Sequence, residues 1–241
     1  LPAAVAGLKT CGIRGFNLTM PNKNKIVELL DELSPEAQLI GAVNTVLNDN
    51  GKLIGYNTDG YGFMQSVRDA GHDITGKNIT VMGVGGASMA ICAQSALDGA
   101  ASVHIFARRT SRYWNRTQKF AENLSAKTGC QVCLFDNDDH TALRDSIAQS
   151  YLLINATSVG MVPDIDDTII KDTSLFHPEL VVADVVYEPQ ETRLLREAKA
   201  AGCQTFNGMY MLLHQGAKAF QIWTGQEMPV SVIKEKYFSV K

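Results

Sequence analysis

The sequence predicts an α/β protein with a doubly wound parallel sheet and a smaller α/β domain that C-terminal helices complete. Two observations support this prediction. Short apolar segments alternate with helical segments through residues 61–208, as a parallel sheet with crossover helices requires. A glycine-rich turn at residues 83–88 follows the first of these apolar segments and precedes an alanine-rich helix, which is typical of a Rossmann-like fold.

The larger domain is predicted from its strand and helix segments. Strands are expected at residues 78–82, 102–106, 130–135, 151–155, 180–185 and 204–205. The apolar run of residues 78–82 suits a strand that is buried on both faces. Helices are expected at residues 61–70, 87–97 and 191–201, with a further helix that ends near residue 128.

The flanking segments predict the smaller domain. A helix tail is expected at residues 1–8, a strand at 15–19, a helix from Pro21 to about Leu33, a further helical turn capped by Ser34, and a hairpin over residues 42–56. Two helices are expected at residues 209–220 and 230–237. We therefore divide the chain into a substrate domain (1–60), a dinucleotide-binding domain (61–208) and C-terminal helices that return to the substrate domain (209–241).

The composition excludes several classes of partner. The net charge of -3 argues against nucleic acid as a partner, because neutralising phosphates requires an excess of basic residues. No apolar run approaches the roughly 20 residues that span a bilayer, so we expect no membrane association. The pair Cys130 and Cys133 lies in a strand-like stretch with no second ligand pair. We therefore predict no metal site and a reducing, cytoplasmic compartment.

The glycine turn and the segment after the second strand bear on the cofactor. Gly83 permits a tight turn, Gly85 lets a pyrophosphate approach the backbone, and the following helix N-terminus favours anions. Residues 106–112 contain three arginines and no carboxylate to hold a ribose 2′-hydroxyl. Guanidinium groups suit a 2′-phosphate, so we predict NADP, with NAD as the alternative. A solvated basic loop would give the same pattern.

Lys23 and Asp59 are the candidates for proton transfer. Lys23 is expected in the first turn of a helix, where a cation opposes the helix dipole and helix stability would not favour it. Asp59 lies on a turn after a strand, and Asn44 follows another strand. A lysine and a carboxylate that converge on one hydroxyl can exchange its proton during alcohol oxidation. Taken singly, Lys23 could be a surface lysine and Asp59 a helix cap.

Six segments together resemble the shikimate dehydrogenase family. They are, in order, residues 17–23 (Asn-Leu-Thr-Met-Pro-Asn-Lys), 41–45 (Gly-Ala-Val-Asn-Thr), 55–60 (Gly-Tyr-Asn-Thr-Asp-Gly), 83–87 (Gly-Val-Gly-Gly-Ala), 154–161 (Ile-Asn-Ala-Thr-Ser-Val-Gly-Met) and 211–217 (Met-Leu-Leu-His-Gln-Gly-Ala). The resemblance spans nearly the whole chain. It implies reversible oxidation of shikimate to 3-dehydroshikimate, or of quinate to 3-dehydroquinate, in aromatic amino acid biosynthesis.

The resemblance also implies roles for individual residues. Lys23 and Asp59 match catalytic positions, with protonated Lys23 donating in the reduction direction and Asp59 orienting the hydroxyl or sharing the role of base. Positions that bind the substrate are matched by Thr19, Asn44, Tyr187 and Gln215. Positions that bind the cofactor are matched by Gly83, Val84, Gly85, Gly86, Ala87, Arg108, Arg109, Ser111, Arg112, Thr157, Ser158, Val185 and Gly208.

The sequence departs from the family pattern at three places. The N-terminal half-domain with its Ser-x-Ser motif is absent, so we expect the substrate domain to be incomplete in this chain. Ala107 stands where the family usually has an asparagine. The sequence of residues 20–23 resembles the quinate/shikimate branch, yet Thr110 stands where that branch usually has an aspartate. We expect shikimate or quinate as the small-molecule substrate, and a monomer or a homodimer as the oligomeric state. The alternatives are a non-catalytic homologue that binds nucleotide or shikimate, and a Rossmann dehydrogenase with another substrate.

Overall fold

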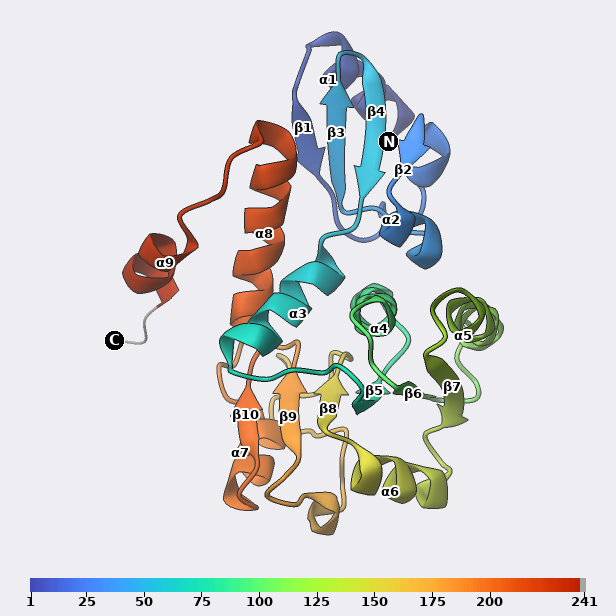
Figure 1. The fold of residues 1–241 in the computed structure, drawn as a ribbon, viewed down its shortest axis with the longest axis vertical. Coiled ribbons are helices and arrows are strands. Elements are labelled where there is room, and N and C mark those ends of the chain that lie inside the picture. Colours follow the sequence, from blue (N-terminus) through green and yellow to red (C-terminus); the bar gives the residue numbers. More distant parts are fainter. Residues whose placement is uncertain (239–241) are drawn as a thin grey trace.

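A computed structural model describes residues 1–238 and shows two α/β bodies joined by long helices (Figure 1). The larger body contains a six-stranded parallel sheet in the order β10-β9-β8-β5-β6-β7. Its strands are β5 (Asn78–Met82), β6 (Ser102–Ala107), β7 (Gln131–Asp136), β8 (Leu152–Asn155), β9 (Val181–Asp184) and β10 (Gln204–Phe206). The chain leaves β5 first toward one edge and then toward the other. The predicted doubly wound sheet is therefore confirmed.

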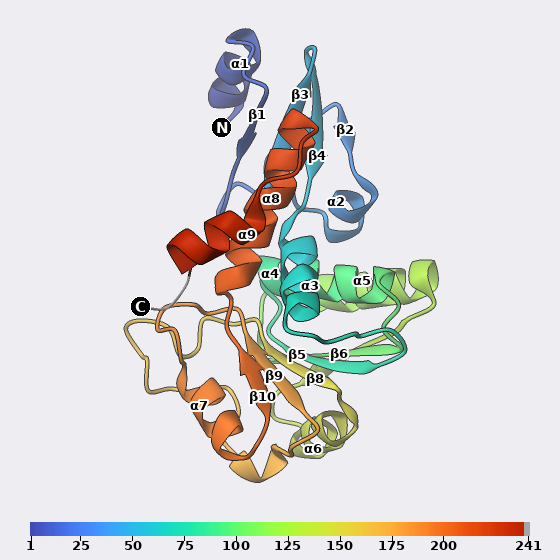
Figure 2. The same ribbon diagram turned by 60° about the vertical axis from the view of Figure 1, so that its left-hand side comes forward.

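Helices cover both faces of this sheet. One face carries α3 (Asp59–Asp69), α4 (Gly86–Leu97) and α5 (Trp114–Thr128), and the other carries α6 (His140–Gln149) and α7 (Arg193–Ala200) (Figures 1 and 2). In β8, Leu152 and Ile154 belong to the first core and Leu153 to the second. Because successive side chains of a strand point to opposite faces, an unbroken apolar strand supplies two cores.

The smaller body is a four-stranded sheet in the order β1-β3-β4-β2. Its strands are β1 (Gly15–Asn17), β2 (Glu32–Leu33), β3 (Thr45–Asp49) and β4 (Lys52–Tyr56), and its helices are α1 (Pro2–Thr10) and α2 (Pro35–Ile40). β3 and β4 form the predicted hairpin, turning at Asn50, whose φ is 51°. The hydroxyl of Ser34 accepts a hydrogen bond from the Ala37 amide, which confirms the predicted cap of α2.

The helix predicted from Pro21 to Leu33 is wrong. Residues 21–26 form turns, followed by a short 3-10 helix (η1, Val27–Leu29) and then β2, which pairs with β4 in parallel. Two long-range hydrogen bonds hold the segment against the sheet instead: the Val43 amide donates to the Lys23 carbonyl and the Asp31 amide donates to the Leu53 carbonyl. Sheet pairing thus overrides the local helix signal, and Lys23 lies on a turn.

The C-terminal part runs back toward the smaller sheet. α8 (Met209–Thr224) packs along α3, and near its end the Trp223 indole Nε1 donates to the Val46 carbonyl at 2.9 Å. α9 (Val230–Ile233) is followed by a π-helical segment, Lys234–Phe238, so the single helix predicted for residues 230–237 is divided into two types. Residues 239–241, which complete the predicted 209–241 unit, lie outside the described part.

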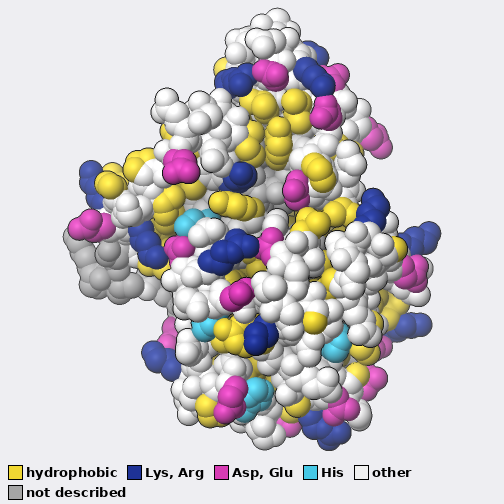
Figure 3. All heavy atoms as spheres, in the orientation of Figure 1, with side chains coloured by type: hydrophobic (Ala, Val, Ile, Leu, Met, Phe, Trp, Pro, Cys, Tyr) yellow, Lys and Arg dark blue, Asp and Glu magenta, His cyan; other side chains and the backbone are white. Residues whose placement is uncertain are grey.

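The surface carries charges of both signs side by side on the face shown in Figure 3, with apolar side chains gathered over β3 and β4. Within residues 1–238 no helix is long and apolar enough to cross a bilayer, and no group of three or more His, Cys, Asp or Glu side chains is arranged to hold a metal ion. Cys133 lies in β7 and Cys130 directly precedes it; both are free thiols.

Candidate functional site

Two cavities meet where the two bodies face each other. The larger, of about 1290 Å³, lies at the carboxyl ends of β5, β6, β8 and β9, which is where open α/β sheets bind ligands. The smaller, of about 540 Å³, lies between β1, β3 and α8. Lys23, Ala87, Val185 and Tyr187 line both cavities. A molecule in one cavity can therefore reach a molecule in the other at this junction.

The glycine turn forms the floor of the larger cavity. Gly83 has φ +109°, and a Cβ there would lie 2.8 Å from the Thr157 side chain, so only glycine fits. A Cβ on Gly85 or Gly86 would meet nothing within 4 Å, so the space above the turn is open to a ligand. α4 begins at Gly86 without a side-chain cap, and its first N–H groups present the positive end of the helix dipole. The turn is thus shaped for an anion.

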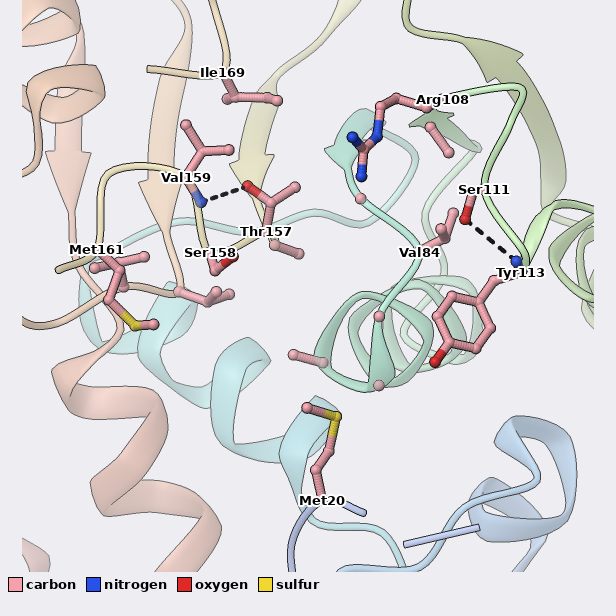
Figure 4. A pocket seen from close by; sticks show the side chains of 18 of the residues that line it. Met20, Val84, Arg108, Ser111, Tyr113, Thr157, Ser158, Val159, Met161 and Ile169 are labelled. Atoms are coloured by element: carbon pink, nitrogen blue, oxygen red, sulfur yellow. Dashed lines mark hydrogen bonds between the residues drawn. The ribbon is translucent and has the colours of Figure 1, made fainter. Parts of the chain in front are cut away.

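The arginine segment after β6 divides into two groups. Arg108, Ser111 and Arg112 line the larger cavity, and Figure 4 shows Arg108 reaching in from the side opposite Met20. Arg109 does not line it: its guanidinium lies over the Trp114 ring, 4.6 Å from the ring centroid. The structure therefore brings two of the three predicted arginines to the cavity, and a cofactor role of Arg109 stays a prediction.

The remaining residues predicted to bind cofactor come from β8, β9 and the start of α8. Thr157 and Ser158 line the larger cavity beyond β8, and Val185 lines both cavities beyond β9. Gly208 lines only the smaller one, where a Cβ would overlap the Val185 carbonyl oxygen at 2.1 Å. Gly208 therefore lets α8 begin directly against the end of β9.

Lys23 and Asp59 form an ion pair at the junction of the cavities. The Lys23 Nζ lies 2.6 Å from Asp59 Oδ2, and the two side chains are 16% and 4% exposed. Asp59 is the first residue of α3, where the helix dipole favours a carboxylate. The Asp59 amide donates to the Asn57 side chain at 3.1 Å, which fixes the turn into the helix. The pair that the sequence singles out is thus assembled, with its lysine open to both cavities.

Asn44 connects this pair to the rest of the smaller cavity. Its Nδ2 donates to Asp59 Oδ1 at 2.8 Å and lies 3.3 Å from Gln215 Oε1 on α8. Its Oδ1 accepts hydrogen bonds from the Thr58 amide at 2.9 Å and from the Thr45 hydroxyl at 2.9 Å. Both oxygens of the Asp59 carboxylate therefore have a donor. Asn44, which directly precedes β3, links that strand to the start of α3 and to α8.

The other predicted substrate residues surround this network. Thr19, Tyr187 and Gln215 all line the smaller cavity. Sequence reasoning missed Met20, a residue that is 77% exposed and points into the larger cavity (Figure 4). It also missed Tyr113 and Asn137, which line the same cavity. Apolar and amide side chains carry no spacing signal, and only the fold could reveal them.

Comparison with known proteins decides the family. The profile described as "Shikimate dehydrogenase substrate binding domain" matches residues 1–46, and "Shikimate 5'-dehydrogenase C-terminal domain" matches residues 208–236. A shikimate dehydrogenase (NADP(+)) of Listeria innocua is 51% identical over 99% of this chain and 81% of its own length. The chain belongs to the shikimate dehydrogenase family.

Two further relatives define the neighbourhood within the family. A quinate/shikimate dehydrogenase of Escherichia coli is 43% identical over 97% of this chain and 81% of its own length. The crystal structure of a Listeria monocytogenes shikimate 5-dehydrogenase in complex with shikimate and NAD superposes with a TM-score of 0.94 at 50% identity, over 97% of this chain and 81% of that one. The family predicted from the six segments is thus confirmed.

Proposed function

We propose that this protein catalyses the reversible, NADP-dependent oxidation of shikimate to 3-dehydroshikimate. The observation that carries the proposal is the position of Lys23, which is paired with Asp59 and lines both cavities. A proton-transfer group at that junction can act on a hydroxyl whose carbon faces the larger cavity. Relatives named for this activity are identical to this protein at about half of the aligned positions, over nearly the whole chain.

The residues of the larger cavity fit a dinucleotide. The open space above Gly85 and Gly86 and the uncapped start of α4 suit a pyrophosphate, and Arg108 and Arg112 suit a 2′-phosphate. When bound, the nicotinamide supplies the acceptor for the hydride that leaves the substrate carbon, or the donor in the reverse direction. Relatives hold NADP in some structures and NAD in others.

Lys23 and Asp59 handle the proton in this scheme. In the reduction direction, Lys23 Nζ donates a proton to the oxygen of the carbonyl as it becomes a hydroxyl. In the oxidation direction, the hydroxyl proton passes to the same pair, with Asp59 sharing the role of base. Asn44 and Gln215 orient the substrate from the far side of the carboxylate, and Thr19 and Tyr187 complete the cavity.

Residues 1–60 and 209–241 act as the substrate part and residues 61–208 as the dinucleotide part, in support of which α8 reaches back to β3 through Trp223. Quinate is the second candidate substrate, because a relative at 43% identity is named for quinate and shikimate. The cytoplasmic compartment and the monomeric or homodimeric state stay predictions, which fractionation and light scattering would test.

Turnover of Lys23→Ala tests the proposal. Because positioned proton transfer contributes roughly 10²–10⁴-fold to a rate, we expect kcat to fall by about that factor with a small change in KM for shikimate. The readout is the absorbance of reduced nicotinamide with shikimate and with quinate. Lys25→Ala is the matched control, since Lys25 is an exposed lysine outside both cavities.

Two results would contradict the proposal. If wild-type protein turned over neither substrate with NADP or NAD, the non-catalytic alternative would hold. If KM rose greatly in Lys23→Ala while kcat stayed the same, Lys23 would bind substrate and another group would transfer the proton.

A further inference from the structure

Asp184 is a carboxylate at the end of β9 with no access to solvent and no cationic partner in the hydrogen bonds that it makes. Its exposure is 0%, and it accepts hydrogen bonds from three donors: Asn155 Nδ2 at 3.0 Å, the Val186 amide at 2.9 Å and the Thr192 hydroxyl at 2.8 Å. Burial raises the pKa of Asp184, and the three donors oppose that rise. Such a group is costly to bury unless its hydrogen bonds are complete, and here they join three segments.

Asn155 continues the network from the neighbouring strand β8. It is also fully buried, and all of its hydrogen-bonding capacity is used within the protein. Its Nδ2 donates to Asp184 and to the Val159 carbonyl, and its Oδ1 accepts from the amide and the hydroxyl of Thr157 at 3.1 and 2.6 Å. The Thr157 hydroxyl in turn accepts from the Val159 amide (Figure 4).

The segments held in this way are those that line the larger cavity. Residues 157–159 line it beyond β8, and residues 185–188 line it beyond β9. Neither Asn155 nor Asp184 lines a cavity itself. Both therefore lie behind the ligand-facing residues, and the hydrogen bond between them links the two segments.

We propose that Asn155 and Asp184 are positioning residues that hold the segments 156–161 and 185–188 in the conformation that binds the dinucleotide. The proposal rests on the proposed function for the identity of the ligand. The two residues differ in the segments that they hold directly. Asn155 bonds directly to the first segment, which lines the larger cavity alone, and reaches the second only through Asp184. Asp184 bonds directly to the second segment through the Val186 amide, and Val185 and Tyr187 of that segment line the substrate cavity as well.

Two variants test which segment each of the two residues holds. In Asn155→Ala we expect the KM for NADP and the dissociation constant of NADPH, followed by its fluorescence, to rise on the order of tenfold or more, because several hydrogen bonds that order the segment are lost. KM for shikimate should stay within about twofold. In Asp184→Asn, which keeps the volume and removes the charge, both KM values should rise.

The control lies at the opposite end of the same strand. Ser150, just before β8, makes an equally buried hydrogen bond with Thr80 at 2.7 Å, far from both cavities in the chain's fold. Ser150→Ala should lower the melting temperature and leave both KM values unchanged. Hydrogen exchange of the Thr157 and Val159 amides should quicken in Asn155→Ala and stay as in wild type in Ser150→Ala.

The outcomes separate this inference from the proposed function. If wild-type protein turns over shikimate but Asn155→Ala binds NADPH as tightly as wild type, the positioning role is wrong and the proposed function stands. If Asn155→Ala does not fold, Asp184→Asn decides: unchanged NADPH affinity overturns the role, and weakened affinity with unchanged affinity in Ser150→Ala supports it. A wild type without turnover overturns the proposed function, while the NADPH titrations still test the two residues.

Discussion

Gly62 sets the distance between the two helices that carry Asp59 and Gln215. A Cβ at Gly62 in α3 would lie 2.7 Å from the Gln215 amide nitrogen and 2.7 Å from the Met211 carbonyl oxygen, both in the backbone of α8. On the same helix, a Cβ at Gly60 would lie 2.3 Å from the Ala90 carbonyl oxygen of α4. α3 is therefore packed by backbone on two sides, and it cannot move away from α8 without meeting α4.

The substitution Gly62→Ala should push α8 away from α3. The new methyl group is about 0.7 Å too close to two backbone atoms for ordinary contact, and neither atom can rotate away. Overpacking of this kind costs about 1–3 kcal/mol, and the better helix propensity of alanine returns about 1 kcal/mol. The net loss of roughly 0–2 kcal/mol corresponds to a melting temperature lower by up to about 8 °C in a chain of this size.

Gly62→Ala should also lower activity, because a displacement of about 1 Å at a reacting centre can lower the rate on the order of 10²-fold. We expect kcat/KM for shikimate to fall roughly 10–100-fold, with the KM for NADP nearly unchanged, since Gly62 and Gln215 line no part of the larger cavity. Gly7→Ala in α1 is the control: its Cβ would meet nothing within 4 Å, so this variant should gain stability. Equal stabilisation by both substitutions would refute the reasoning.

Two further predictions concern the cofactor and the response to pH. Arg108→Ala should raise the KM for NADP about 10–100-fold, as expected for a lost charge-assisted hydrogen bond, and leave the KM for NAD nearly unchanged. Arg109→Ala should leave both KM values nearly unchanged. Equal effects of the two substitutions would place Arg109 in the site. Burial tends to raise the pKa of Asp69, but hydrogen bonds from His214 and Gln65 outweigh it and hold the pKa below its ordinary value. The ion-paired carboxylate therefore adds stability above about pH 4, which is lost as pH falls through the lowered pKa. The stability difference between wild type and Asp69→Asn, from urea unfolding at several pH values, should shrink on acidification; a constant difference would contradict it.

The larger sheet could be predicted from the sequence because its signals are local and continuous. Strand β5 is buried from Ile79 to Met82, on both faces of the sheet, and apolar at all of these positions except Thr80; the glycine turn follows it immediately. Once the strand order is given, the right-handed crossovers decide which face of the sheet each helix covers. The proton-transfer residues Lys23 and Asp59 could be predicted for a different reason, because they lie in segments whose sequences match motifs of the shikimate dehydrogenase family.

The parts that could not be predicted depend on contacts distant in sequence. Residues 21–33 have a helix signal at Pro21, but the pairing of β2 with β4 and the hydrogen bond from the Val43 amide to the Lys23 carbonyl decide their structure. The exposure of Met20 inside the cleft and the burial of Asp184 behind it likewise follow from how the two bodies meet. No periodicity within either segment encodes these contacts.

The close packing of α3 against α4 also explains how two separate ligand sites keep one spacing. Asp59 begins α3 and the glycine turn begins α4, so each helix presents its N-terminus to one cavity. The contact of Gly60 with the Ala90 carbonyl lies within about one turn of both N-termini. A larger residue at that contact would separate the carboxylate from the pyrophosphate turn. The distance between the group that moves the proton and the surface that holds the dinucleotide is therefore set by backbone contact, which deforms less readily than contact between flexible side chains.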